Sequence, residues 1–77
     1  MKVAELKMLF DNALILNVSI KNTYGYWVIN IHRKNCKVKD AYQLLINDKG
    51  KTREFKTLDA AYNACRAIGI KNLEVLG

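Results

Sequence analysis

The chain has 77 residues and a formal net charge of +6; 51% of its residues are hydrophobic and 26% are charged. This composition is typical of a folded domain and excludes a disordered basic tail, which would be depleted in aliphatic and aromatic residues. The length predicts one domain over residues 1–77, and a chain this short buries only about 60% of its unfolded surface, so a homodimer would add stability. No apolar run is long enough to span a bilayer, and Glu5 and Asp11 argue against a secretion signal, so we expect a cytoplasmic protein without a membrane partner.

The first half of the chain predicts one helix and two strands. Apolar residues at helical spacing indicate an amphipathic helix from about Lys2 to Asn12, namely Val3, Leu6, Leu9, Phe10 and Ala13. The following period of two predicts a strand whose apolar face carries Leu14, Leu16, Val18 and Ile20. Turn-prone residues 21–25 separate it from a strand over 26–33, in which Trp27, Ile29 and Ile31 share the core face. The opposite face of that strand carries Tyr26, Val28, Asn30 and His32.

The second half predicts a hairpin, a helix and a last strand. After a basic loop over residues 34–40, Tyr42, Leu44 and Ile46 are expected on the core face of a third strand, and Gln43, Leu45 and Asn47 on its other face. Residues 47–50 are a hairpin signal that leads to a fourth strand, about Lys51 to Lys56, with Phe55 in the core. Thr57 is expected to cap a helix over residues 58–68 that ends at Gly69 in a Schellman motif. Lys71 to Leu76 is the predicted last strand.

These elements predict an α+β fold of order αββββαβ, with a mostly antiparallel sheet of four to five strands and two helices packed on one face. The other face would carry polar and aromatic side chains. We interpret that open face as a binding surface or a dimer interface.

Basic residues are concentrated in the middle of the chain. Eight of the thirteen lie between Arg33 and Lys56, against three acidic residues in the same stretch. Lysine and arginine near phosphates release condensed counterions, so this window favours a nucleic-acid partner, and exposed tyrosines could stack on bases. The expected nucleic-acid-binding residues are Tyr26, Asn30, His32, Arg33, Lys34, Lys37, Lys39, Gln43, Lys49, Lys51, Arg53 and Lys56. The alternative is that these side chains form the solvated face of an ordinary basic protein.

No catalytic, metal or cofactor motif is present in the sequence. His32, Cys36 and Cys65 lack the close spacing of a zinc site, and the seven acidic residues are scattered. Cys36 is interpreted as a solvated loop thiol and Cys65 as a small core residue. We therefore expect a protein that is not an enzyme and needs no cofactor.

The segment from Tyr42 to Leu76 reads Tyr-x-Leu-x-Ile-x-Asp-x-Gly-Lys-x-Arg-x-Phe-x-Thr-Leu-Asp-Ala-Ala, followed by Ala-Ile-Gly-Ile and a final strand. This pattern resembles small plasmid- and phage-borne accessory proteins, including ParC-family partition-associated proteins. It is similar, more loosely, to arm-type integrase and AP2 domains, in which a three-stranded sheet lies in the DNA major groove. That likeness implies that Asn30, His32, Gln43 and Arg53 lie near bases or phosphates. The helix-first order also resembles double-stranded RNA-binding domains, but the lysine cluster that those carry at the start of the last helix is absent around residues 57–61.

The functional hypothesis is a non-enzymatic accessory protein of a mobile element, forming a homodimer and binding DNA or a nucleoprotein complex through its basic hairpins. The rival hypothesis is a protein-interaction module, such as a regulator or inhibitor of a host or partition protein. Such a module would use the exposed sheet face or an edge strand.

Overall fold

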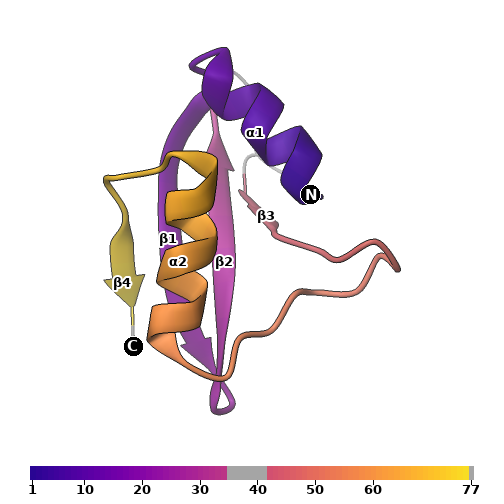
Figure 1. The fold of residues 1–77 in the computed structure, drawn as a ribbon, viewed down its shortest axis with the longest axis vertical. Helices are drawn as coiled ribbons and strands as arrows, with labels where there is room; N and C mark the ends of the chain where they lie inside the picture. The colour runs from indigo at the N-terminus through magenta and orange to yellow at the C-terminus, as the bar shows by residue number, and fades with distance from the viewer. Residues whose placement is uncertain (35–41, 77) are drawn as a thin grey trace.

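A computed structural model describes residues 1–34 and 42–76 of the chain. The elements are α1 (Val3–Asp11), β1 (Ile15–Thr23), β2 (Tyr26–Arg33), β3 (Tyr42–Leu44), α2 (Leu58–Ile68) and β4 (Glu74–Leu76). The four strands form one sheet in the order β3-β2-β1-β4, in which only the β1–β4 pair is parallel. Figure 1 shows α2 lying over β1 and β2. The predicted α+β class is confirmed.

Both helices pack on the same face of the sheet. The core joins apolar residues of α1 and α2 to alternate residues of the two long strands, namely Leu6, Leu9, Ala61, Cys65, Ile68, Val18, Ile20, Ile29 and Ile31. The pairs Ile20↔Ile29 and Val18↔Ile31 lie directly opposite each other across β1 and β2. This face is called the core face, and the opposite one the open face.

The predicted strand over residues 51–56 is wrong as an element. Only two isolated bridges occur there, Ile46↔Thr52 and Trp27↔Phe55. The outer edge of β2 is instead covered by two segments in turn, because β3 pairs with residues 30–32 and Phe55 pairs with Trp27 further along. The chain between them leaves β2 and forms a turn closed by its own hydrogen bonds, which projects from the sheet in Figure 1, so no continuous strand forms there.

The expected core face of β1 is wrong at its beginning. Ile15 pairs with Arg33 and Asn17 with His32, so Leu16 is an extra residue without a partner on β2. Such a bulge reverses the alternation of side chains on one side of it. Ile15 therefore packs against the core, whereas Leu14 and Leu16 are 38% and 56% exposed.

The predicted register of the third strand is also wrong. Gln43 pairs with Ile31, which puts Gln43 on the core face and Tyr42 and Leu44 on the open face. Leu45 donates its backbone N–H to the Ile29 carbonyl and is fully buried. Alternation could not decide between Leu44 and Leu45, because both are apolar and a shift of one residue exchanges the two faces.

Both ends of α2 follow the sequence signals. The Thr57 hydroxyl accepts a hydrogen bond from the Ala60 N–H at 3.1 Å. At the other end Gly69 has φ 106°, and the N–H groups of Gly69 and Ile70 donate to the carbonyls of Arg66 and Cys65. This is the expected Schellman motif, and it turns the chain toward β4. Ala61, Cys65 and Ile68 are the buried residues of α2, whereas Tyr62 is 39% exposed.

Candidate nucleic-acid interface

An ordered turn over residues 46–53 displays three of the predicted basic residues, Lys49, Lys51 and Arg53. The Asn47 N–H donates to the Lys51 carbonyl at 2.8 Å, and the Gly50 N–H donates to the Asn47 carbonyl at 3.0 Å. The Asn47 side-chain oxygen also accepts from the N–H groups of Lys49 and Lys51. These bonds satisfy the backbone of the turn internally, so the lysine side chains project from a defined frame.

Arg53 is held at the base of this turn. Its N–H donates to the Leu45 carbonyl at 2.9 Å, and its guanidinium carbon lies 5.1 Å from the centre of the Phe55 ring. The N–H groups of a guanidinium point outward in its own plane, so an arginine that lies over an aromatic face can still bind a phosphate.

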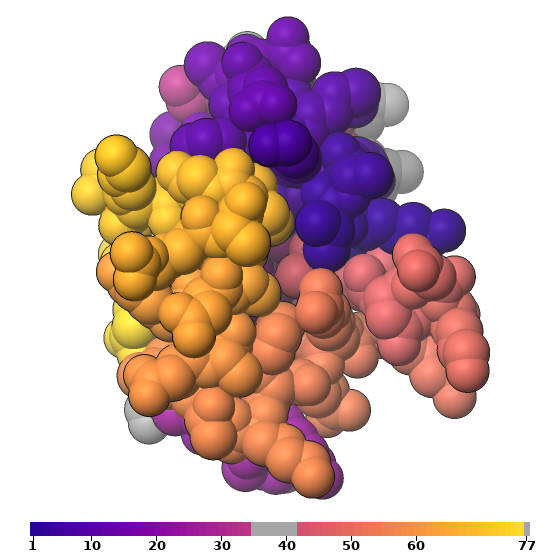
Figure 2. All heavy atoms as spheres, in the orientation of Figure 1, coloured from indigo at the N-terminus to yellow at the C-terminus, as the bar shows by residue number. Residues whose placement is uncertain are grey.

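The start of the chain lies against the same turn and adds a fourth basic residue. Met1 is bonded to the end of β3, because its amino group donates to the Leu44 carbonyl at 2.9 Å and its carbonyl accepts from the Ile46 N–H at 2.7 Å. Lys2 and Arg53 consequently line one shallow hollow, together with Val3, Ala4, Ile46, Asn47 and Asp48. In Figure 2 the segment around the turn projects beside the first residues of the chain.

We call Lys2, Lys49, Lys51 and Arg53 the basic turn. All four side chains are exposed, and one carboxylate, that of Asp48, lines the hollow with Lys2 and Arg53. The cluster therefore has a net charge of +3, which is half of the chain's total. Sequence reasoning missed Lys2, because no local pattern signals that residues 2 and 53 line the same hollow.

The remaining predicted basic residues do not join the basic turn. The Lys34 N–H donates to the Leu14 carbonyl, just beyond the C-terminal end of α1, whereas the basic turn lies at its N-terminal end. The nine residues of α1 separate these ends by about 13 Å. Arg33 is half-buried at the end of β2, and Lys56 is exposed just before α2. Lys37 and Lys39 lie outside the described residues.

The predicted uncharged contacts are divided between the two faces. Tyr26, Asn30 and His32 lie on the open face as expected, but Gln43 is on the core face and half-buried. His32 stacks on Tyr42 with 4.2 Å between the ring centres. A shallow open-face hollow of about 670 Å³ is lined by Lys21, Thr23, Tyr24, Tyr26, Val28, Asn30, Tyr42, Leu44, Thr52 and Glu54. It holds one basic and one acidic side chain, so it offers phosphates no net attraction.

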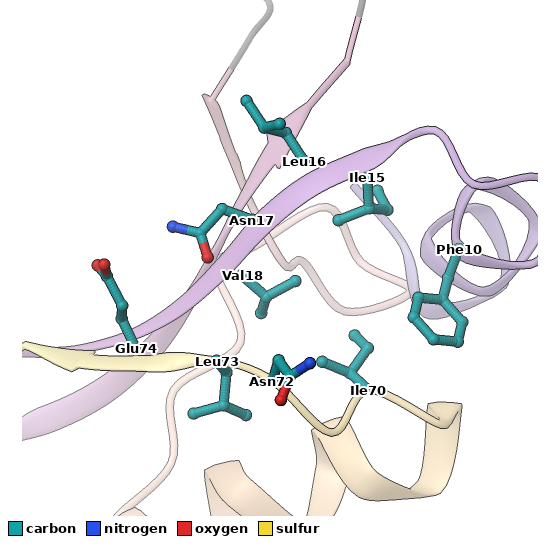
Figure 3. A pocket seen from close by; sticks show the side chains of 9 residues that line it. All are labelled: Phe10, Ile15, Leu16, Asn17, Val18, Ile70, Asn72, Leu73 and Glu74. Atoms are coloured by element: carbon teal, nitrogen blue, oxygen red, sulfur yellow. The ribbon is translucent and has the colours of Figure 1, made fainter.

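A third hollow lies at the edge of the sheet, where β1 and the segment before β4 diverge. In Figure 3 Val18 and Ile70 point toward each other there, whereas Leu16 points away. Phe10, Ile15 and Leu73 extend the apolar part of the lining, Asn17 and Asn72 add two side-chain amides, and Glu74 is the one acidic residue. Among the described residues, this hollow contains one carboxylate and no basic side chain, so it offers phosphates no net attraction.

The described residues contain little that suggests other chemistry. In residues 1–34 and 42–76 no group of three or more His, Cys, Asp or Glu is placed to hold a metal ion. Neither described helix combines the length and the apolar character needed to cross a membrane. Burial raises the pKa of the Cys65 thiol to about 11, so Cys65 is a protonated core residue. Cys36 lies outside the described residues.

The chain matches no protein-family model, and no curated protein or solved structure is significantly similar to it. The resemblance of residues 42–76 to plasmid and phage accessory proteins therefore stays a prediction.

Proposed function

We propose that this protein binds DNA through the basic turn, with Lys2, Lys49, Lys51 and Arg53 contacting phosphates. The observation that carries the proposal is the shared hollow of Lys2 and Arg53 beside the lysines of the turn, which concentrates four cations around one carboxylate. Each cation placed near a phosphate releases condensed counterions, and this entropy gain drives binding.

The contacts proposed here position DNA without reading its sequence. Lysine and arginine side chains at phosphates carry no base information, and the polar residues expected to read bases, Asn30 and His32, lie on the open face instead. We therefore expect binding that depends little on sequence. Duplex DNA is the preferred form, because its phosphates have the higher charge density.

The test is binding of a labelled DNA duplex by fluorescence anisotropy across a salt series. Four phosphate contacts predict that log K falls against log salt with a slope of about −3.6. The variant Lys49→Glu/Lys51→Glu should reduce affinity at least about tenfold and flatten that slope. The matched control is Lys34→Glu/Lys71→Glu, which changes the net charge equally at two exposed sites away from the turn.

The outcomes separate two explanations. If only the turn variant weakens binding, the basic turn is the contact surface. Equal weakening by both variants would show diffuse attraction by net charge, and no binding at about 50 mM salt would refute the proposal, because electrostatic attraction is strong there.

The open face favours a second candidate function, that of a protein-interaction module. Tyr26, Tyr42 and Leu44 are 43%, 60% and 41% exposed on one sheet face, and tyrosine is enriched at protein interfaces. A contact made by this face would depend far less on salt than DNA binding does. The mobile-element setting proposed from the sequence applies to either function.

A further inference from the structure

The open face carries three side chains in a row across the sheet: the first is positively charged, the second is uncharged and the third is negatively charged. Lys21 on β1 pairs with Val28 on β2. On the other side of β2, the bridge Trp27↔Phe55 brings Glu54 next to Val28, and all three residues line the open-face hollow. Since neighbouring strands lie about 4.8 Å apart, Lys21 and Glu54 are about 10 Å apart at the backbone, with Val28 midway.

The charges of this row are complementary to those of the same row in a second copy of the chain. Consider a second copy stacked face to face on the first, with a two-fold axis that runs along β2 between the two sheets. The rotation exchanges the two sides of β2, so Lys21 of each copy lies over Glu54 of the other, and the two Val28 residues, each 7% exposed within its hollow, face each other across the axis. Strands related in this way run in similar directions, which agrees with aligned sheet packing.

The same rotation suits the rest of the open face. Asn30, beside Val28 on β2, meets its own counterpart on the axis, and a pair of side-chain amides can bond reciprocally. Leu44 pairs with Asn30 and lies opposite Ser19 of the other copy. Glu74 on β4, which pairs with Ser19, adds a charge to this face and lies at the outer strand, where solvent weakens its effect.

We propose that the open face is the interface of a two-fold homodimer, in which Lys21 of one copy pairs with Glu54 of the other. The basic turn takes no part in this contact, so the proposal does not depend on DNA binding. It also accounts for the exposed Tyr26, Tyr42 and Leu44, which the stacked sheets would cover.

The area of the open face sets the expected strength of self-association. Four strands at about 4.8 Å and about 20 Å of strand length give a face of roughly 400 Å² in projection, which is small beside the roughly 800 Å² per partner of stable complexes. We therefore expect a reversible dimer in the micromolar range. Sedimentation equilibrium should show an apparent mass that rises with concentration toward twice that of one chain.

A charge exchange tests the pairing directly. Lys21→Glu alone and Glu54→Lys alone each place two like-charged pairs in the interface, and each should weaken self-association by at least about tenfold. An equimolar mixture of these two single variants should associate about as well as the parent, because both pairs become attractive again. The double variant Lys21→Glu/Glu54→Lys should likewise form dimers.

The controls keep the test independent of folding. Lys21 and Glu54 are exposed, so the thermal melts of dilute single variants should match the parent. Lys71→Glu changes the net charge by the same amount as Lys21→Glu, at a site away from the open face. It should leave self-association unchanged. The proposal is overturned if the parent stays monomeric at the highest concentration, or if the mixture of folded single variants associates no better than either variant alone.

Discussion

Ala13 and Gly69 occupy the same position at the ends of the two helices, and both have a left-handed backbone, with φ of 57° and 106°. The N–H groups of Ala13 and Leu14 donate to the carbonyls of Phe10 and Leu9, as those of Gly69 and Ile70 donate to Arg66 and Cys65. Both helices therefore end in a Schellman motif. Only α2 has the glycine that this position favours.

Replacing Ala13 by glycine should stabilise the protein. A left-handed conformation costs an L-residue about 1 kcal/mol or more, and glycine avoids this cost. Part of the stability gained in this way is lost, because the unfolded chain is more flexible at a glycine. We expect Ala13→Gly to raise the free energy of unfolding by about 0.5 kcal/mol in urea titrations. Ala4→Gly, in the first turn of α1 and exposed, is the control and should lower it by up to about 1 kcal/mol. A loss of stability in Ala13→Gly would show that α1 does not end there.

Gly69 should not tolerate a side chain. A Cβ atom at this residue would lie 3.3 Å from Cε2 of Phe10, which is closer than ordinary contact, and the φ of 106° is unfavourable for an L-residue. Gly69→Ala should lower the free energy of unfolding by about 1 to 2 kcal/mol. Combining Gly69→Ala with Phe10→Leu separates the close contact from the unfavourable φ, because removing the ring relieves only the close contact.

The register of β3 can be tested with two adjacent leucines. Leu45 is fully buried and Leu44 is 41% exposed. Leu45→Ala should lower the free energy of unfolding by about 2 to 5 kcal/mol through loss of burial and the cavity left behind. Leu44→Ala should cost less than about 1 kcal/mol. If Leu44→Ala lowered the urea midpoint of unfolding more than Leu45→Ala, β3 would be shifted by one residue.

Cys65 should make stability depend on pH in alkaline solution. Its pKa is raised from 9.0 to about 11 by burial, so between these values the folded thiol keeps a proton that the unfolded chain releases. Unfolding is then favoured as pH rises, and the stability contribution that is complete below pH 9 is lost toward about pH 11. The stability difference between the parent and Cys65→Ala should narrow by about 1 to 2 kcal/mol across this window. A constant difference in urea titrations would show that Cys65 is accessible to water.

Asp48 should oppose DNA binding, because its carboxylate lines the hollow that Lys2 and Arg53 share. Asp48→Asn keeps the shape of the side chain and removes the charge, so affinity for duplex DNA should rise by about threefold to tenfold at low salt. Asp59→Asn, at the start of α2, is the control for the change in net charge. Equal gains in both variants would argue against a local role of the basic turn.

Local rules determined the parts of the fold that depend on neighbouring residues. The Thr57 cap and Gly69 bounded α2 correctly, residues 47–50 formed the predicted turn, and strict alternation assigned the two faces of β2. Each of these features depends on contacts between residues a few positions apart, so the sequence alone is sufficient to predict them.

Only the tertiary structure decided which distant segments meet. The extra residue Leu16, the choice of Leu45 over Leu44, and the parallel pairing of β4 with β1 all depend on how strands align, and one-residue shifts leave the local pattern almost unchanged. The candidate sites follow the same rule. Lys2 lines the same hollow as Arg53 because the start of the chain bonds to the end of β3, and Lys21 lines the same hollow as Glu54 because both flank β2. Charge could be counted from the sequence, but the surface on which it gathers was decided by strand pairing.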